Sequence, residues 1–249
     1  MKDVVIVTGA SSGIGAATAR LLGAAGASVV VNYRSSRDLA EGVVGDVIAA
    51  GGRAVAIGAD MGSEADIVRL FEETDRAFGP VTGLVNNAGV NGPALRRLED
   101  YAFKETMDIL AVNTAGLLIA CREAVKRMST RHGGEGGVIV NLSSVAARLG
   151  APNTYVDYAA SKGAVDSFTV GLGHEVAGEG IRVAAIRPGL IDTEIHASGG
   201  EPDRAHRLAH MVPMQRVGTA DEIANAIVWL MSDEASYVTS AILDVSGGR

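Results

Sequence analysis

Short apolar runs alternate with longer helical segments along the whole chain, and this alternation restricts the fold more than any other feature. The apolar runs, rich in valine and isoleucine, cover residues 4–7, 29–31, 54–57, 84–85, 138–140, 183–186 and 242–245. The helical segments between them cover roughly residues 14–25, 36–51, 63–78, 100–131, 155–178 and 219–232. Strands joined by helical crossovers pair in parallel, and right-handed crossovers cover both faces of the sheet. The pattern predicts an α/β fold with a doubly wound sheet of seven parallel strands and helices on both faces.

The length and composition are those of one domain. The chain has 249 residues, 47% of them hydrophobic, and shows neither a linker nor an internal repeat, so we expect residues 1–249 to form a single domain. The one cysteine, Cys121, lies in an apolar helical stretch, which favours an inert buried thiol and a reducing compartment. The chain starts without the apolar segment of a signal peptide, and no run approaches the ~20 residues that span a bilayer. We therefore expect a cytoplasmic protein that does not enter a membrane.

The charge of the chain disfavours nucleic acid as a partner. Acidic residues outnumber basic ones by 29 to 22, the net charge is −7, and no dense Lys/Arg run accompanies aromatic residues. The most basic stretch, Lys126-Arg127 with Arg131, is better interpreted as positive charge near a helix C-terminus. Other acidic partners are disfavoured by the same net charge.

A glycine-rich turn joins the first apolar run to the first helical segment. It reads Thr8-Gly9-Ala10-Ser11-Ser12-Gly13-Ile14-Gly15. Gly9 permits backbone angles closed to other residues, Gly13 lets the backbone approach a ligand, and Gly15 lets the helix lie close to the strand. Amide groups and a positive dipole at the helix N-terminus suit a pyrophosphate. The turn thus predicts a dinucleotide site, although its Gly-x3-Gly-x-Gly spacing is not the commoner fingerprint and a purely structural turn would look the same.

Further motifs stand just after predicted strands. They are the stretch from Asn86 to Gly89, the pair Ser143-Ser144 and the pair Pro188-Gly189. The carboxyl ends of parallel strands lie along one edge of a sheet, where ligands of such folds bind. We therefore expect these motifs and the glycine turn to line a single cleft.

The loop after the second apolar run indicates which nicotinamide dinucleotide is preferred. An acidic residue about 20 positions past the glycines would bind a ribose 2′-hydroxyl, but no carboxylate stands there. Arg34, Ser35 and Arg37 offer guanidinium and hydroxyl groups suited to a 2′-phosphate. The loop predicts a preference for NADP(H), with NAD(H) as the alternative. Solvated surface arginines are the competing interpretation.

Tyr158 and Lys162 stand four residues apart in a helical stretch, so their side chains project from one face. A phenol has an unperturbed pKa of about 10, and a nearby ammonium group lowers it by favouring the phenolate. Lowering it to about 7 needs roughly 4 kcal/mol, which close charges in a partly dry cleft can supply. The pair predicts acid–base chemistry because it accompanies the dinucleotide turn; alone, the same spacing occurs in many helices.

Together these motifs resemble the short-chain dehydrogenase/reductase family from end to end. The stretch Asn86-Asn87-Ala88-Gly89, Asn113, Ser143-Ser144, Tyr158-x3-Lys162 and Arg187-Pro188-Gly189 stand in the family's order. The stretches Asn32-Tyr33-Arg34-Ser35, Val156-Asp157-Tyr158 and Ser246-Gly247-Gly248 look most like a branch of bacterial 3-oxoacyl reductases and glucose 1-dehydrogenases. The resemblance implies a Rossmann-like fold and NAD(P)-dependent hydride transfer between a nicotinamide and a carbonyl or secondary alcohol.

The resemblance also implies a role for each matching residue. Tyr158 would be the acid/base, Lys162 would lower its pKa and hold the nicotinamide ribose, Ser144 would hydrogen-bond the substrate oxygen, and Asn113 would anchor a water molecule. Cofactor contacts would come from Gly9, Ser11, Ser12, Gly13, Ile14, Gly15, Arg34, Ser35, Asp60, Met61, Asn87, Ala88, Gly89, Tyr158, Lys162, Pro188, Gly189 and Thr193. From the residues alone, Ser144 also suits a turn serine, Asn113 an amide that bonds helix backbone, and Asp60 and Thr193 caps or turns.

Two assignments within the predicted site need a choice. Only Tyr158 has a lysine four residues on, so Tyr155 is expected to shape the pocket. Alignment with the family through Asn141-Leu142 favours Ser144 over Ser143, and a small insertion between Arg148 and Thr154 would explain its longer distance from Tyr158.

The segment 190–216 is far longer than a routine connection and is predicted to be a substrate lid. It contains His206 and His210 at metal-ligand spacing, but no third ligand pattern accompanies them, so solvated histidines are expected and no metal site.

Two other functions stay open at this stage. One is a reductase of acyl-carrier-bound 3-oxoacyl chains, although Gly178-Glu179-Gly180, at the helix end expected to dock an acidic carrier, has the wrong charge. The other is a non-catalytic NADP-sensing protein, which would have lost one of Tyr158, Lys162 and Ser144. The segment 220–231 and the apolar C-terminal strand resemble family surfaces that pack in tetramers, so a homotetramer is expected.

Overall fold

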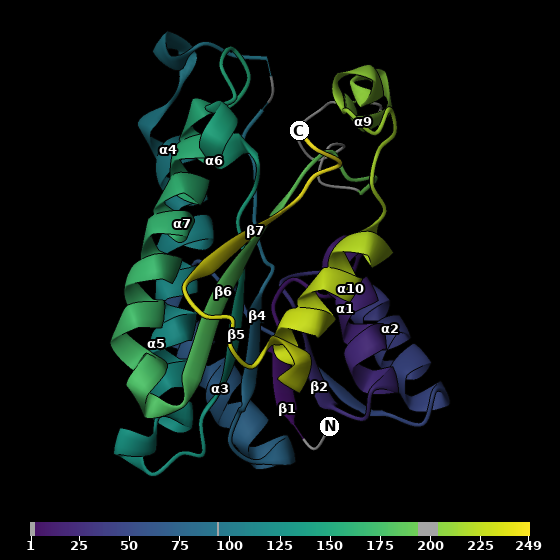
Figure 1. Ribbon diagram of the computed structural model, residues 1–249, viewed down its shortest axis with the longest axis vertical. Helices are drawn as coiled ribbons and strands as arrows, with labels where there is room; N and C mark the ends of the chain where they lie inside the picture. The colour runs from purple at the N-terminus through teal and green to yellow at the C-terminus, as the bar shows by residue number, and fades with distance from the viewer. Residues whose placement is uncertain (1–2, 94, 194–203) are drawn as a thin grey trace.

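The computed structural model describes residues 3–93, 95–193 and 204–249. Its centre is one parallel sheet with the strand order β3-β2-β1-β4-β5-β6-β7 (Figure 1). The strands are β1 (Val4–Val7), β2 (Ser28–Tyr33), β3 (Arg53–Gly58), β4 (Gly83–Asn86), β5 (Gly137–Leu142), β6 (Ile181–Pro188) and β7 (Ala241–Val245). This confirms the predicted doubly wound sheet of seven parallel strands, and the strand order reverses direction between β1 and β4, as it does where such folds bind ligands.

Helices cover both faces of the sheet (Figure 1). One face carries α1 (Gly13–Ala24), α2 (Arg37–Ala49) and α10 (Ala220–Met231), and the other carries α3 (Glu64–Phe78), α5 (Leu117–Met128) and α7 (Val156–Val176). Successive strand residues point to opposite faces: Val5 and Val7 pack in one buried cluster and Ile6 in the other. Two aliphatic cores therefore hold the sheet, and the predicted helix ends differ from the observed ones by one or two residues, where helices fray.

The predicted helix over residues 100–131 is divided in the structure. It consists of α4 (Phe103–Leu110), a π-helical stretch over Ala111–Gly116 and then α5, and a short 3-10 turn follows at Thr130–His132. Gly116 packs against the backbone of Met61, which lies just before α3. A Cβ on Gly116 would lie 1.7 Å from the Met61 carbonyl oxygen. A hydrophobic period does not reveal this contact, which explains why a single continuous helix was predicted.

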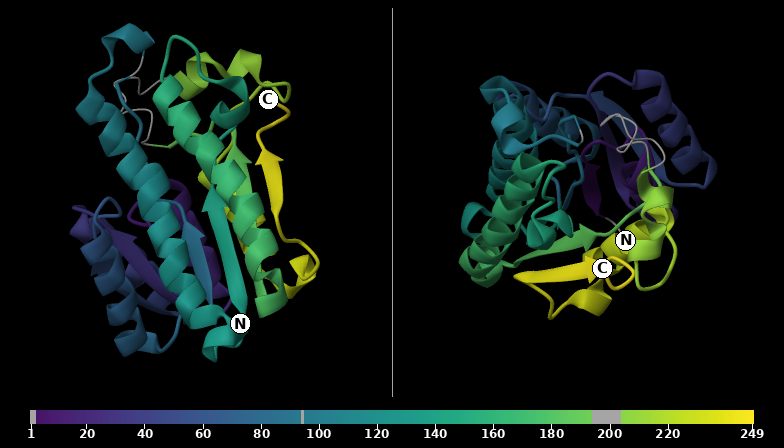
Figure 2. Two further views of the ribbon diagram at one scale, coloured as in Figure 1. Left: turned by 90° about the vertical axis from the view of Figure 1, so that its left-hand side faces the viewer. Right: turned by 90° about the horizontal axis from the view of Figure 1, so that it is seen from above.

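The strands point toward one end of the molecule, where the segment 204–211 lies (Figure 2). The segment 190–216 contains α9 (Arg204–Arg207) and a 3-10 turn over Ala209–Met211, and a parallel bridge pairs Ile191 with Gly218. Residues 194–203 of the predicted lid lie outside the described residues. After β5, a short helix α6 (Ala146–Leu149) leads into a turn with positive φ at Ala151 and Asn153, in the segment where an insertion was expected.

Cys121 is buried, and burial raises the pKa of its thiol to about 12, as expected for an inert cysteine. Within the described ranges, no helix has both the length and the apolar character that a bilayer span requires.

Candidate active site

A cavity of about 1010 Å³ lies at the carboxyl ends of the strands. Seventeen of the predicted site residues line it: Gly9, Ser11, Ser12, Gly13, Ile14, Arg34, Ser35, Asp60, Asn87, Ala88, Gly89, Ser144, Tyr158, Lys162, Pro188, Gly189 and Thr193. Three others, Gly15, Met61 and Asn113, are buried and do not belong to its lining. The motifs that stand after separate strands therefore meet in one cavity, as their positions in the sequence predict.

The glycine turn is held by the stretch that follows β4. Gly9 has φ of 60°, and a Cβ there would lie 2.9 Å from the Ala88 Cα. The Asn87 amide nitrogen Nδ2 donates to the carbonyl oxygens of Thr8 (2.8 Å) and Gly9 (2.9 Å). In return, the Thr8 hydroxyl accepts from the backbone amides of Asn87 (3.0 Å) and Ala88 (2.9 Å). Asn87 thus fixes the turn as well as lining the cavity.

The N-terminus of α1 faces the cavity without a side-chain cap. Ser12 is the N-cap residue, but its hydroxyl accepts no bond from the helix, and the first turn contains no acidic residue. Gly13, with φ of 54°, and Ile14 bring the first-turn backbone to the cavity wall. Uncapped amides and the helix dipole suit an anion such as a pyrophosphate.

Gly15 has a different part from Gly13. A Cβ on Gly15 would lie 2.5 Å from both the Gly9 carbonyl oxygen and the Asn87 Nδ2. The absence of a side chain at Gly15 therefore lets α1 pack against the turn. Gly15 faces the turn, which is why it does not belong to the cavity wall.

Asn32 is a residue of this site whose position the sequence did not reveal. Its Oδ1 accepts from the Gly9 amide (3.1 Å), and its Nδ2 donates to the carbonyl oxygens of Ile57 and Ala59 (3.2 Å each). Asn32 joins β2, β3 and the glycine turn. A buried asparagine that ends an apolar strand was the available signal, since a buried amide has to find partners.

The loop after β2 contributes to the cavity wall. Arg34 is exposed, and with Tyr33, Ser35 and Ser36 it lines the cavity, whereas Arg37 turns outward on α2 and lies 3.6 Å from Glu41. On the neighbouring strand end, Asp60 lines the cavity while its Oδ1 accepts from the Gly62 amide at 2.8 Å. Asp60 is therefore a turn aspartate that is also available to a ligand.

Tyr158 and Lys162 come from the first two turns of α7. Lys162 is 4% exposed, its Nζ donates to the Leu142 carbonyl oxygen at 2.6 Å, and it lies 5.7 Å from the centroid of the Tyr158 ring. Burial lowers the pKa of Lys162 to about 8, opposed by the charge of Asp166. The amine therefore keeps its proton at neutral pH, and a cation stands beside the phenol.

The two serines after β5 have different surroundings. Ser143 is buried and its hydroxyl donates to the Lys162 carbonyl oxygen at 3.2 Å, whereas the half-buried Ser144 accepts from the Ala146 amide at 3.1 Å. Ser144 is therefore a turn serine, as one interpretation of the sequence had it, and its hydroxyl hydrogen is left for another acceptor.

Asn113 lies in the π-helical stretch and is fully buried. Its side chain exchanges two 2.8 Å hydrogen bonds with the backbone of Val90, and its Nδ2 also donates to the Ser161 hydroxyl at 3.1 Å. Its amide thus fastens the chain after β4 to α7. A direct contact with a cavity water stays a prediction.

Apolar side chains line much of the rest of the cavity. Tyr155 packs edge-on against Tyr158 with ring centroids 5.6 Å apart, which agrees with its expected part in shaping the pocket. Further apolar residues of the lining include Val90, Val145, Leu149, Pro152, Leu190, Leu208 and Met211. Leu149 and Met211 are 44% and 52% exposed, so the cavity offers apolar surface to a ligand.

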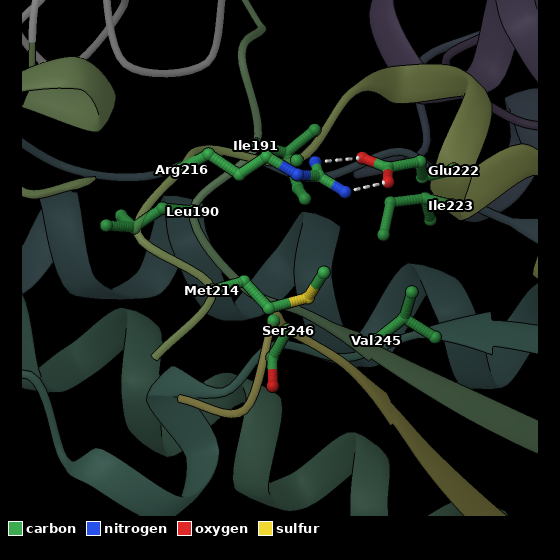
Figure 3. Close-up of a pocket in the computed structure, with 10 residues that line it drawn as sticks. Leu190, Ile191, Met214, Arg216, Glu222, Ile223, Val245 and Ser246 are labelled. Carbon is green, nitrogen blue, oxygen red and sulfur yellow. Dashed lines mark hydrogen bonds and ion pairs between the residues drawn. The ribbon is translucent and has the colours of Figure 1, made fainter. Parts of the chain in front are cut away.

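A second, smaller cavity of about 130 Å³ is lined by residues from both ends of the segment 190–216 and shares Leu190 and Ile191 with the large one. Figure 3 shows the Arg216 guanidinium forked onto Glu222 at its rim, with Met214 and Ser246 below. The guanidinium lowers the pKa of Glu222 to about 2. This cavity is too small for a dinucleotide, and the ion pair attaches the end of the segment 190–216 to α10.

Within the described part of the chain, no three His, Cys, Asp or Glu side chains form a group that could hold a metal ion. His206 Nε2 lies 3.4 Å from Asp192 Oδ2, and both side chains are exposed.

Comparisons with known proteins agree with this geometry. The family model described as enoyl-(acyl carrier protein) reductase matches residues 9–249. The chain is 50% identical over 246 residues to the uncharacterized oxidoreductase YgfF of Escherichia coli strain K12, covering 99% of each. It is 40% identical to 3beta-hydroxysteroid dehydrogenase 1 of Eggerthella lenta, covering 98% of this chain and 92% of that one. A solved mutant of a Serratia marcescens short-chain dehydrogenase/reductase superposes with a TM-score of 0.90 at 34% identity, over 99% of this chain and 97% of the other.

These matches extend over nearly the whole chain, at identities that establish common descent, and the fold agrees with them. 3-oxoacyl-[acyl-carrier-protein] reductase of Synechocystis and glucose 1-dehydrogenase 2 of Bacillus subtilis, at 35% and 36% identity, represent the two activities that the sequence resembles. The chain belongs to the short-chain dehydrogenase/reductase family and is an oxidoreductase that uses a nicotinamide cofactor.

Proposed function

We propose that this oxidoreductase prefers NADP(H), interconverts a carbonyl compound and a secondary alcohol, and uses Tyr158 as the acid/base. The observation that carries the proposal is the buried Lys162 ammonium 5.7 Å from the Tyr158 ring, in a cavity that also contains the glycine turn. A volume of about 1010 Å³ accommodates a dinucleotide together with a substrate, since a pocket for one drug-sized ligand measures about 300–1,000 Å³.

The residues of the cavity suit NADP(H) along its length. The uncapped N-terminus of α1 suits the pyrophosphate, and Arg34 and Ser35 suit a 2′-phosphate at the adenosine end. Asp60, Met61, Ala88, Gly89, Pro188, Gly189 and Thr193 complete the proposed contacts. Met61 would act through its backbone or through packing, because its side chain is buried outside the cavity lining. NAD(H) lacks the 2′-phosphate and would bind with fewer charged contacts.

The proton chemistry would come from the chain itself. A bound nicotinamide supplies or accepts the hydride, which no side chain can do. Tyr158 would give its proton to the substrate oxygen in reduction and take it back in oxidation. Lys162 would favour the phenolate, and the Ser144 hydroxyl would donate to the substrate oxygen, where negative charge develops. Asn113 would order the chain behind these groups.

The substrate we propose is an uncharged, predominantly apolar ketone or alcohol. Outside the proposed cofactor and catalytic contacts, the described residues of the cavity wall are aliphatic or aromatic apart from Ser36, Asn91, Ser143, Thr154 and Arg249. An apolar ring system would displace water from Leu149 and Met211, whereas a carboxylate placed against these apolar side chains would lose hydration without compensation. The hydroxysteroid named for one relative is a substrate of this kind.

A turnover assay tests the proposal. We expect NADPH-dependent reduction of methyl 4-oxocyclohexanecarboxylate and of 2-decalone, with weaker use of NADH and much weaker reduction of the free acid 4-oxocyclohexanecarboxylate. Turnover of acyl-carrier-bound 3-oxoacyl chains alone would replace this proposal by the acyl-carrier reductase. Measurable NADPH binding without any turnover across carbonyl substrates would favour the sensor.

We propose further that residues 1–249 act as one domain, that 190–216 serves as the substrate lid, and that the chain is a cytoplasmic homotetramer. Leu208 and Met211 of the segment line the cavity, which supports the lid. Trp229 on α10 and Leu243 on the edge strand β7 are exposed, which supports packing against further copies. A mass measurement in solution tests the tetramer, and a mass of one chain would contradict it.

A further inference from the structure

The first turn of α7, which carries Tyr158, has no cap from its own N-cap residue. Tyr155 holds the N-cap position, but its side chain makes no capping hydrogen bond. The first bond within the helix runs from the Ala159 amide to the Tyr155 carbonyl oxygen at 3.1 Å. The preceding amides therefore need partners from elsewhere, because the start of a helix leaves its first N–H groups without intrahelical acceptors.

Tyr101 and Asp157 supply two of these partners. The Val156 amide donates to the Tyr101 hydroxyl at 3.1 Å, and the Tyr158 amide donates to Asp157 Oδ1 at 2.8 Å. Tyr101 stands 55 positions before Val156, at the entry to α4. The start of the catalytic helix is thus fastened to a separate part of the chain.

Tyr101 is itself held in place by Arg96. The Arg96 guanidinium carbon lies 5.0 Å from the centroid of the Tyr101 ring, and its Nη1 donates to Glu105 Oε2 at 2.9 Å. Glu105 also accepts from the Ala102 amide at 3.3 Å, which fixes it at the start of α4. The chain of contacts runs from α4 through Arg96 and the Tyr101 ring to the amide of Val156.

Two buried atoms of this cluster have no hydrogen-bond partner among the described residues: Asp157 Oδ2 and Arg96 Nε. Asp157 is 8% exposed. A Cβ on Gly92 would lie 3.7 Å from Arg96 Nη2 and 4.0 Å from Asp157 Oδ2, so these opposite charges approach the same point. Buried unpaired groups are rare in proteins and call for an explanation beyond packing, such as a role in catalysis. The Asp157 carboxylate is also favourable beside the N-terminus of a helix.

We propose that Tyr101, held by Arg96, is a positioning residue for Tyr158. The ring of Tyr158 reaches the cavity from the third residue of α7, so its place depends on the backbone of the first turn. Lys162 fixes the helix one turn further on, and the Tyr101 hydroxyl and Asp157 hold two amides of the first turn. A frayed first turn would move the phenol from the substrate oxygen, and a displacement of about 1 Å can cost about 100-fold in rate. The inference rests on the proposed acid/base role of Tyr158.

The test compares Tyr101→Phe with Tyr237→Phe. The second substitution also removes one phenolic hydroxyl, but Tyr237 is fully exposed and outside the cavity lining. With NADPH and 2-decalone, Tyr101→Phe is expected to lower kcat about tenfold and to raise the primary isotope effect of NADPH deuterated at the transferred position, while the Kd for NADPH stays within about twofold. Tyr237→Phe is expected to change none of the three.

A second measurement needs no turnover. Hydrogen exchange followed by mass spectrometry is expected to show faster exchange at the Val156 amide in Tyr101→Phe, with no change in Tyr237→Phe. Arg96→Gln, which leaves the Tyr101 hydroxyl in place, should produce a smaller change in the same direction.

Three outcomes would overturn the inference. They are unchanged exchange at Val156, an unchanged kcat in Tyr101→Phe, and a loss of kcat that is matched by an equal loss of NADPH affinity, which would indicate a general structural defect. A wild-type protein without turnover would instead contradict the proposed function, while the exchange measurement would still decide whether Tyr101 holds the first turn of α7.

Discussion

Lys162 lies beside the ring of Tyr158, with its Nζ 5.7 Å from the ring centroid and 2.6 Å from the Leu142 carbonyl oxygen. The carbonyl accepts one of the three N–H donors of the ammonium and leaves two for other partners. Since burial brings the pKa of Lys162 only down to about 8, its positive charge persists at neutral pH. Because Lys162 is buried, water screens this charge little, and the cation stays close to the phenol.

Tyr158→Phe should remove the proton donor and leave the cavity shape intact. We expect kcat for 2-decalone reduction to fall about 1,000-fold, because positioned acid–base groups contribute about 10²–10⁴. The Kd for NADPH, measured by fluorescence, should change less than about threefold. Tyr155→Phe is the matched control, because Tyr155 packs against Tyr158 but has no lysine one turn on. Retained turnover in Tyr158→Phe would end its assignment as the acid/base.

Arg34→Ala should weaken NADPH binding far more than NADH binding. A charge-assisted hydrogen bond to phosphate contributes about 1.5–3 kcal/mol, so the Kd for NADPH should rise at least tenfold while that for NADH stays within about twofold. Arg37→Ala is the control, because Arg37 faces Glu41 outside the cavity lining. Equal losses for the two cofactors would contradict the proposed 2′-phosphate contact.

Lys162 should give the stability of the protein a pH dependence of known sign. The pKa of its amine is about 8 in the folded protein and 10.5 in an exposed chain, so between these values the unfolded state binds more protons. Stability therefore rises with pH through this window relative to a variant without the amine. We expect unfolding free energies of Tyr158→Phe and Tyr158→Phe/Lys162→Met, measured in urea, to differ by a constant amount below pH 7.

Between pH 8 and pH 10.5, the unfolding free energy of Tyr158→Phe, which retains Lys162, should rise with pH relative to that of the double variant. The Tyr158→Phe background removes the neighbouring phenol, which is a second ionisable group beside the amine. A difference that stays constant up to pH 10.5 would show that burial does not perturb the amine.

Gly116→Ala should destabilise the fold strongly. The added Cβ would lie 1.7 Å from the Met61 carbonyl oxygen, which backbone movement alone can relieve, so we expect a loss of about 3 kcal/mol in unfolding free energy. Gly171→Ala in α7 is the matched control, because a Cβ there meets nothing within 4 Å and alanine favours the helix by about 1 kcal/mol. Urea unfolding measures both. A loss smaller than about 1 kcal/mol in Gly116→Ala would mean that the π-helical stretch and Met61 separate easily.

The sequence by itself determined which segments form strands and helices along the chain, and it predicted that the motifs meet in one cavity. Both follow from local physics: apolar runs of strand length and helical periods identify the elements, and parallel pairing brings the strand ends to one edge. The glycine turn, Arg34, Tyr158 and Lys162 were found because each rule that identifies them acts within a few residues.

The tertiary structure alone decided which side chains face the cavity and which hold it together. Gly15, Met61 and Asn113 belong to the family's pattern but lie behind the wall, and Asn32 and Tyr101 became visible only through partners 23 and 55 positions away. The division of the helix over residues 100–131 arose in the same way, from the close approach of Gly116 to Met61. Hydrogen bonds and contacts between distant segments leave no period in the sequence, because they depend on where the completed sheet brings those segments.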